Sequence, residues 1–128
     1  MSIELINPKN EQPLKLSGAN FVDASGNKFP LVRGVLRISH EHNYTDSFGM
    51  QWNKFDKTQL DREEVGHIVS RQRFFAETKW DTQDLTGKNV LEVGSGAGRF
   101  SKVVLECTLA NLYSIDYSDA VTANFKNN

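Results

Sequence analysis

A short apolar run followed at once by a glycine-rich loop is the feature that most constrains the fold of this chain. Residues 89–93 are mainly apolar and rich in β-branched side chains, as in a buried parallel strand. Residues 94–98 read Gly-Ser-Gly-Ala-Gly, and glycine permits the positive φ that a sharp turn from strand to helix needs. The next apolar side chains have the spacing of one helix face: Phe100, Val103, Val104 and Cys107.

A second strand and a second helix follow in the expected order. Residues 111–115 have the pattern of another short strand, and Ser118 can cap a helix whose first turn contains Asp119. The order of strand, helix, strand and helix start predicts the opening of a doubly wound α/β sheet.

The details of the loop indicate which ligand it would bind. A dinucleotide-binding loop would place its third glycine at position 99, but that residue is Arg99 and the glycine is Gly98. Glu92 precedes the first glycine by two residues; its carboxylate would repel a pyrophosphate but could accept hydrogen bonds from an ammonium group. S-adenosylmethionine (SAM) has an ammonium group and no phosphate, so the pattern favours SAM over NAD.

An acid at the end of the second strand supports a nucleoside ligand. Asp116 is placed to accept hydrogen bonds from the two hydroxyls of a ribose. The alternative is that the glycines form a tight turn with no ligand, and the sequence leaves that alternative open.

Residues 90–100 resemble motif I of the class I SAM-dependent methyltransferases, and residues 114–118 resemble their ribose-binding motif. The resemblance implies a Rossmann-like sheet with SAM as cofactor. It implies that the glycines shape the methionine end of the site, that Glu92 receives the ammonium group, that Asp116 holds the ribose and that Tyr117 lies against the adenine. The implied cofactor-binding residues are Glu92, Gly94, Ser95, Gly96, Gly98, Asp116 and Tyr117.

The segment before motif I resembles the cap of a bacterial methyltransferase subgroup, over residues 44–61. This implies that Phe48, Gln51 and Trp52 help to wall the cofactor site. The alternative is that the aromatic residues belong to the core, because aromatics at helical spacing usually do.

The first 39 residues are rich in turn formers and predict a β-hairpin or a three-stranded unit. They resemble the small zinc-binding module that precedes some methyltransferase domains, but without its cysteines, which implies a metal-free relic of that module. Cys107 is the only cysteine, and His40 and His42 have no evident third partner, so no metal site is predicted.

We therefore expect a β-rich module over residues 1–39, a helical cap or linker over 40–84 and a partial SAM-binding domain over 85–128. Within the cap, one helix is expected to begin at Asp46 or Ser47, although Gly49 disfavours it. A longer helix is expected over Asp61–Lys79, with an apolar face: Val65, Ile68, Val69 and Phe75.

The expected function is transfer of a methyl group from SAM to an unknown acceptor, a small molecule. The resemblance places the acceptor and any base on later strands, so no catalytic residue is assigned and the chain is expected to be an inactive part of a larger enzyme or a half-domain. Self-association through the exposed sheet edge is expected. The alternatives are a non-catalytic interaction module that retains the fold motif and a nucleotide-binding oxidoreductase fragment.

The charge and hydropathy of the chain limit the kinds of partner that it is expected to bind. The formal net charge is −1 and the basic residues are scattered, so no nucleic-acid partner is predicted. The chain begins without the pattern of a secretory signal and has no apolar run of membrane-spanning length, which predicts a cytoplasmic protein with no membrane contact.

Overall fold

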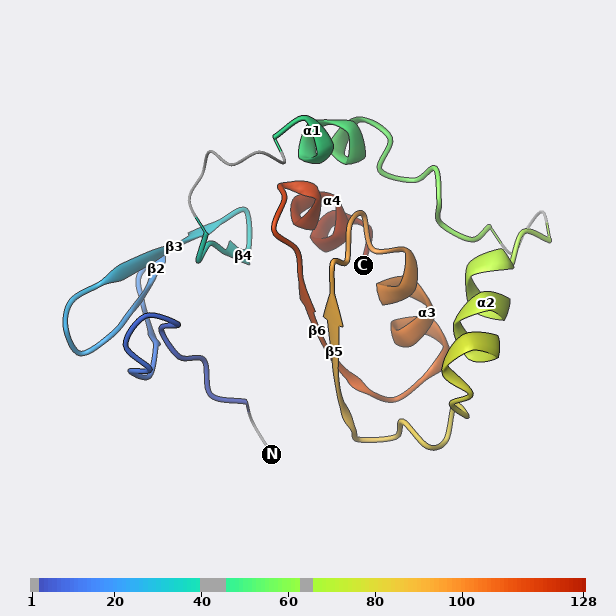
Figure 1. Cartoon of the computed structure of the whole chain (residues 1–128), viewed down its shortest axis with the longest axis horizontal. Helices are drawn as coiled ribbons and strands as arrows, with labels where there is room; N and C mark the ends of the chain where they lie inside the picture. The colour runs from blue at the N-terminus through green and yellow to red at the C-terminus, as the bar shows by residue number, and fades with distance from the viewer. Residues whose placement is uncertain (1–2, 40–45, 63–65) are drawn as a thin grey trace. The chain divides into compact units, whose positions relative to one another are not determined.

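The chain has a mixed α/β fold built as two compact units, Met1–Glu41 and His42–Asn128 (Figure 1). The structure is a computed structural model that describes residues 3–39, 46–62 and 66–128. It contains a four-stranded antiparallel sheet and a two-stranded parallel sheet. The three-part division expected from the sequence stays a prediction, because compactness does not test which segments fold independently.

The first unit is a small antiparallel sheet in the order β1-β2-β3-β4. Its last hairpin turns at Arg33 and Gly34, whose φ values of 52° and 82° are both positive, as a two-residue hairpin loop requires. The fourth strand is only two residues long, which explains why sequence patterning suggested at most three strands. The strands are β1 Lys15–Ser17, β2 Asn20–Val22, β3 Lys28–Val32 and β4 Val35–Leu36.

A buried carboxylate organises this first unit. Asp23 Oδ1 accepts the backbone N–H groups of Ser25 and Asn27, both at 2.9 Å. Its Oδ2 accepts the side-chain amides of Asn7, Asn10 and Asn27 at 2.7, 3.0 and 2.8 Å. Burial raises the pKa of Asp23, but these hydrogen bonds outweigh it and hold the pKa well below its ordinary value. The network ties the N-terminal loop to the β2–β3 turn in a unit with few buried apolar side chains.

We expect Asp23→Ala to unfold the first unit selectively, because three side-chain amides and the backbone N–H of Asn27 lose their acceptor, and the backbone N–H of Ser25 keeps only Gln12. Two-dimensional NMR should show loss of the dispersed amide signals of β1–β4 while those of β5 and β6 persist. Because the folded pKa is lowered, the carboxylate contributes stability above its unfolded pKa of about 3.9 and loses it as pH falls toward the lowered value. The exposed Glu4→Gln variant is the control. Retained β1–β4 signals in Asp23→Ala would contradict the assignment.

The second unit contains a parallel pair of strands joined through a helix. The strands pair from Asn89 opposite Asn111 to Val93 opposite Ile115, with the bounds expected from the sequence. The elements in chain order are β5 Asn89–Val93, α3 Arg99–Cys107, β6 Asn111–Ile115 and α4 Ala120–Asn127.

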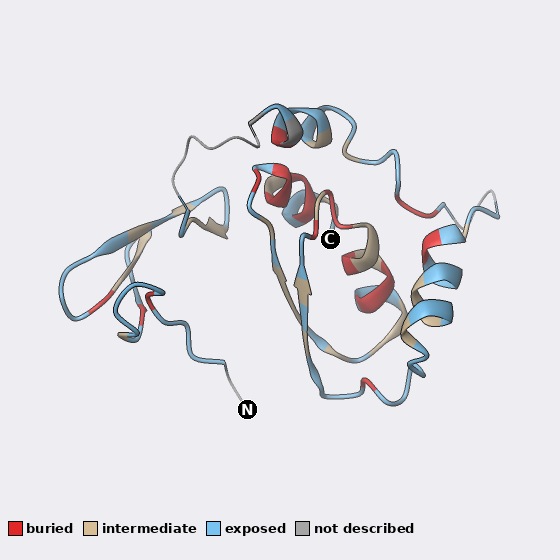
Figure 2. Cartoon of the chain, in the orientation of Figure 1, coloured by how far each residue is buried: buried red, intermediate tan, exposed pale blue. Residues whose placement is uncertain are grey.

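The core of this unit lies on one face of the strand pair. Buried residues gather on α3 and α4 (Figure 2), among them Val103, Val104 and Ala120, so the expected apolar face of α3 is confirmed at the two valines. The other face is exposed, with Leu91 and Val93 at 63% and 72%. The expectation of a fully buried strand is therefore wrong for β5, because no described segment of this unit covers its second face.

The first helix of the second unit, α1 Asp46–Lys54, packs against α4. A Cβ on Gly49 would lie 2.8 Å from Asp119 Cβ and 2.9 Å from its backbone nitrogen. Asn53 Nδ2 also donates to Asp119 O at 3.0 Å. The glycine that disfavours the helix by propensity thus permits the close approach of α1 to the start of α4.

The next helix, α2 Val69–Thr78, is shorter than the sequence predicted. Residues from Asp61 to Ile68 are not helical where described, because Arg62 and His67 form an antiparallel bridge and Gly66 has a φ of 74°. Val69, expected on a buried face, is 49% exposed, and Val65 lies outside the described residues. The helix contacts α3 instead through Phe74, whose ring centroid is 6.1 Å from that of Phe100.

Within the described residues, no helix combines the length and the apolar character needed to cross a bilayer.

Candidate functional site

The glycine loop lies where the carboxyl ends of β5 and β6 meet. Backbone N–H groups of Gly94 and Ser95 donate to the carbonyl of Ile115 at 2.8 and 3.2 Å, which ties the loop to the end of β6. Gly94, Gly96 and Gly98 all have positive φ, at 76°, 53° and 91°. The loop therefore depends on glycine at each of these positions for its backbone conformation.

The three glycines differ in what surrounds them. A Cβ on Gly94 or Gly96 would meet open space. A Cβ on Gly98 would collide with the side-chain amides of Asn124 and Asn128, from α4 and its C-terminus. The first two glycines thus leave room for a ligand, whereas Gly98 leaves room for the packing of α4.

Asp116 joins the loop to the turn after β6. Its Oδ2 accepts the backbone N–H of Gly96 at 2.7 Å, and its Oδ1 accepts the backbone N–H and hydroxyl of Ser118 at 2.7 and 2.6 Å. A carboxylate has about four acceptor sites, so roughly one remains for another donor. A ligand with two hydroxyls would have to share or displace an internal hydrogen bond.

Glu92 lies on the helix-facing side of β5. Its Oε2 accepts hydrogen bonds from the hydroxyls of Ser101 and Ser114, the latter at 2.8 Å. Asn124 Nδ2 in turn donates to Ser101 Oγ at 2.8 Å. Within the described parts of the chain, Oε1 of Glu92 accepts no hydrogen bond and is available to a donor.

These groups surround a cavity of about 250 Å³. Ser95 is 5% exposed, and its hydroxyl is buried without a hydrogen-bond partner among the described residues. A buried polar atom without a partner is costly, so it indicates a place where a bound group or water supplies the missing hydrogen bond. The sequence-predicted residues that line the cavity are Trp52, Glu92, Gly94, Ser95, Gly96 and Asp116.

The remaining sequence-predicted residues are not among the described residues that line the cavity. Gln51 is exposed, Tyr117 is 54% exposed, and Gly98 faces α4. Phe48 belongs to α1, but its side chain lies outside what the structure describes, as do His40 and His42. An adenine-facing role for Tyr117 and a wall role for Gln51 therefore stay predictions from the resemblance.

Sequence reasoning missed several residues of the cavity wall. In the sequence Arg99 departs from the dinucleotide pattern, and its position as the first helical residue after the glycine loop is the signal that would place it near the cavity. The segment after α1 gave no periodic signal, because it is an irregular chain. The missed residues are Asp56, Gln59, Leu60, Ala97, Arg99, Phe100 and Ser118.

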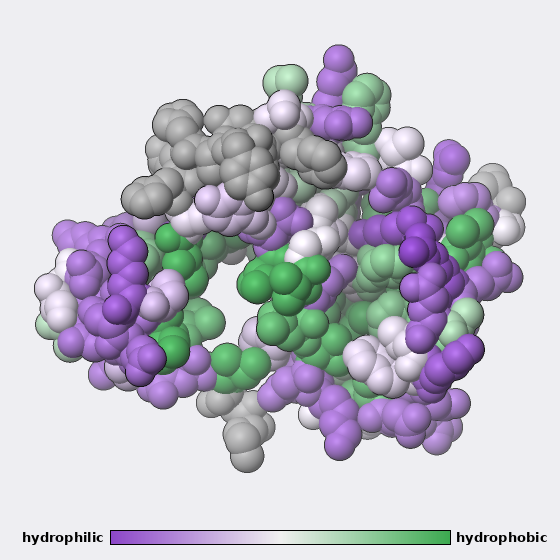
Figure 3. Space-filling view, viewed as in Figure 1, coloured by the Kyte–Doolittle hydropathy of each residue, from purple (hydrophilic) through white to green (hydrophobic). Residues whose placement is uncertain are grey.

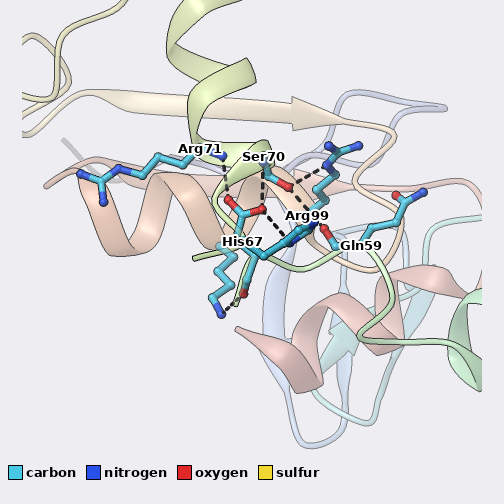
Figure 4. Close-up of polar contacts among 7 residues, drawn as sticks. Gln59, His67, Ser70, Arg71 and Arg99 are labelled. Carbon is cyan, nitrogen blue, oxygen red and sulfur yellow. Dashed lines mark hydrogen bonds and ion pairs between the residues drawn. The ribbon is translucent and has the colours of Figure 1, made fainter. Parts of the chain in front are cut away.

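A polar cluster connects this wall to the start of α2 (Figure 4). Asp61 accepts the backbone N–H groups of Ser70 and Arg71, both at 2.8 Å, and so caps the helix from outside it. Burial raises the pKa of Asp61, but these N–H groups and the His67 charge outweigh it and lower the pKa. The hydroxyl of Ser70 accepts a hydrogen bond from Arg99 Nε at 2.8 Å.

The cluster contains serine, histidine and aspartate, but it is not arranged for nucleophilic catalysis. Ser70 is 1% exposed, and its hydroxyl donates to the Gln59 carbonyl at 3.3 Å. His67 Nδ1 lies 3.9 Å from Asp61, too far for a hydrogen bond. A catalytic serine must be accessible and paired with the histidine, so the cluster is better explained as a structural connection.

No family model matches the chain, and no curated protein is significantly similar to it in sequence. Over residues 3–39, 46–62 and 66–128, no three His, Cys, Asp or Glu side chains are grouped to hold a metal ion.

The two kinds of glycine predict different mutational costs. Gly96→Ala adds a methyl group in open space and should cost about 1–2 kcal/mol of unfolding free energy, from the positive φ alone. Gly98→Ala carries the same strain and also collides with Asn124, which is buried and bonded to Ser101, so it should cost about 1–3 kcal/mol more. Urea unfolding of both variants measures the difference. Equal costs would show that α4 does not pack against Gly98 as described.

Proposed function

We propose that this chain is the SAM-binding part of a methyltransferase, with β5, α3 and β6 as the opening of a Rossmann-like sheet. The observation that carries the proposal is the meeting of Glu92, the open Gly94 and Gly96, and Asp116 around one cavity at the ends of two parallel strands. Ligands of open α/β sheets bind at the carboxyl ends of the strands, where this cavity lies.

Two features of the cavity support a polar ligand of this kind. Among the residues that the structure describes, the hydroxyl of Ser95 has no partner, and Oε1 of Glu92 is free to accept from an ammonium group. The volume of about 250 Å³ is just below the range of roughly 300–1,000 Å³ typical of small-molecule sites. The described walls would therefore enclose one end of SAM, and the other end of the molecule would extend out of the cavity.

The chain's own residues would bind and orient the cofactor. Glu92 would accept from the ammonium group, and Asp116 would accept from a ribose hydroxyl through its remaining site. When bound, SAM supplies an electrophilic methyl group on a sulfonium. No residue is assigned to the acceptor, and the small-molecule acceptor and cytoplasmic location expected from the sequence stay predictions.

Isothermal titration with SAM tests the proposal. We expect binding by the 128-residue chain and a roughly tenfold to hundredfold weaker affinity in Asp116→Ala, from the loss of a charge-assisted hydrogen bond. Asp84→Ala, which removes an exposed carboxylate outside the cavity, should bind as the wild type does. Circular dichroism establishes that each variant is folded. SAM affinity that is the same in Asp116→Ala and wild type would contradict the role of Asp116.

A second candidate is an interaction module that retains the motif without a ligand. The internal hydrogen bonds of Asp116 and Glu92 favour it, because both carboxylates already have structural partners. A folded chain that binds no SAM would support this alternative over the first.

We also propose that the chain self-associates through the strand pair of its second unit. In the described residues β5 and β6 pair only with each other, and their outer face exposes Leu91, Val93 and Ile115. Apolar side chains appear over these strands in the space-filling view (Figure 3). Unpaired strand edges with an apolar face favour association.

Light scattering over a concentration series checks this association. We expect a mass above the monomer value of 14.5 kDa that rises with concentration. Val93→Lys should shift it toward the monomer, because a charge on the outer face resists burial. Met50→Lys, at an exposed position of α1, is the control. A constant 14.5 kDa at all concentrations would contradict the proposal.

A further inference from the structure

One cationic side chain lies among the acidic groups of the cavity. Of the described residues that line it, Asp56, Glu92 and Asp116 carry negative charge, and Arg99 alone carries a positive charge. Asp56 is paired with Lys126 at 3.1 Å, and the other two carboxylates accept hydrogen bonds from serine hydroxyls and backbone N–H groups. The acids of the wall are therefore engaged elsewhere, and Arg99 has no carboxylate partner among the described residues.

The guanidinium of Arg99 is held in place by groups that do not neutralise it. Its Nε donates to Ser70 Oγ at 2.8 Å, and its Cζ lies over the Phe100 ring, 5.2 Å from the centroid. Ser70 is itself fixed by Asp61, which accepts its backbone N–H. Among the described residues, the two terminal nitrogens of Arg99 have no partner. A guanidinium held through Nε, with its Cζ over an aromatic ring, keeps its terminal donors available for an anion.

A second donor without a partner lines the same cavity. Ser95 is 5% exposed, and its hydroxyl has no hydrogen-bond partner in the described chain. A buried donor without a partner is costly, so the hydroxyl favours a bound acceptor in the cavity. Ser95 belongs to the glycine loop and Arg99 begins the helix after it, so both donors come from one short stretch of backbone.

We propose that Arg99 and Ser95 form a carboxylate-binding subsite, so that the cavity takes a ligand bearing a carboxylate near its ammonium group. This inference rests on the proposed function and identifies the residues that would bind the acid end of SAM. A carboxylate fits better than a phosphate, because the three acids of the wall repel a dianion more strongly than a monoanion. The fork of the guanidinium also matches the two oxygens of a carboxylate.

Comparison of SAM with decarboxylated SAM tests the subsite, because the two compounds differ only in the carboxylate. We expect the wild-type chain to bind SAM roughly tenfold to hundredfold more tightly, the effect of a charge-assisted hydrogen bond. Arg99→Met should remove this preference by weakening SAM binding while leaving the affinity for decarboxylated SAM within a few-fold. Arg73→Met is the matched control, since Arg73 lies on α2 and pairs with Glu77 outside the cavity.

The outcomes separate the subsite from the proposed function. Suppose that both compounds bind to the wild type. If Arg99→Met then weakens the binding of both equally, or changes the binding of neither, the subsite is overturned and the proposed function stands. If neither binds to the folded wild type, the proposed function fails and the subsite with it. Adenosine monophosphate binding that is tighter than SAM binding and lost in Arg99→Met would overturn the carboxylate assignment. Should Arg99→Met fail to fold, Ser95→Ala must reduce the preference for SAM, and an unchanged preference would overturn the proposal.

Discussion

The hydrogen bonds of Asp116 are the interaction on which the arrangement of the site depends. One oxygen holds the backbone of Gly96 and the other holds the turn that leads into α4. A single side chain at the end of β6 therefore positions the loop after β5 and the start of the next helix. The parallel pairing of the two strands brings these segments to the same edge, and the carboxylate then joins them.

A layer of amides and hydroxyls supports the loop from the side of α4. Asn124 donates to Ser101, and Ser101 donates to Glu92, so α4, α3 and β5 share one polar network. Gly98 admits the asparagines at the base of this network. Buried polar networks stabilise a fold when their members are satisfied, and within the described part of the chain the buried hydroxyl of Ser95 is left without a partner at the cavity.

The segment before α2 supports the site mainly through polar side chains, which the aromatic pattern of the cap did not indicate. Trp52 lines the cavity, but the stronger connection is through Asp61 and Ser70 to Arg99. The buried Asp61 of this irregular segment caps α2 at Ser70, and Ser70 in turn orients Arg99 on α3. The close approach of Gly49 to Asp119 secures α1 on the same unit.

The sequence by itself determined the local elements around the loop. The bounds of β5 and β6, the apolar face of α3 and the placement of Glu92, Gly94, Gly96 and Asp116 follow from short-range patterns, because strand, turn and helix preferences act over neighbouring residues. Only the tertiary structure decided that α2 begins at Val69, that Gly98 makes room for α4, and that Ser70 holds the guanidinium of Arg99. Each of these depends on contacts between residues distant in sequence, such as the cap from Asp61, which no periodicity encodes.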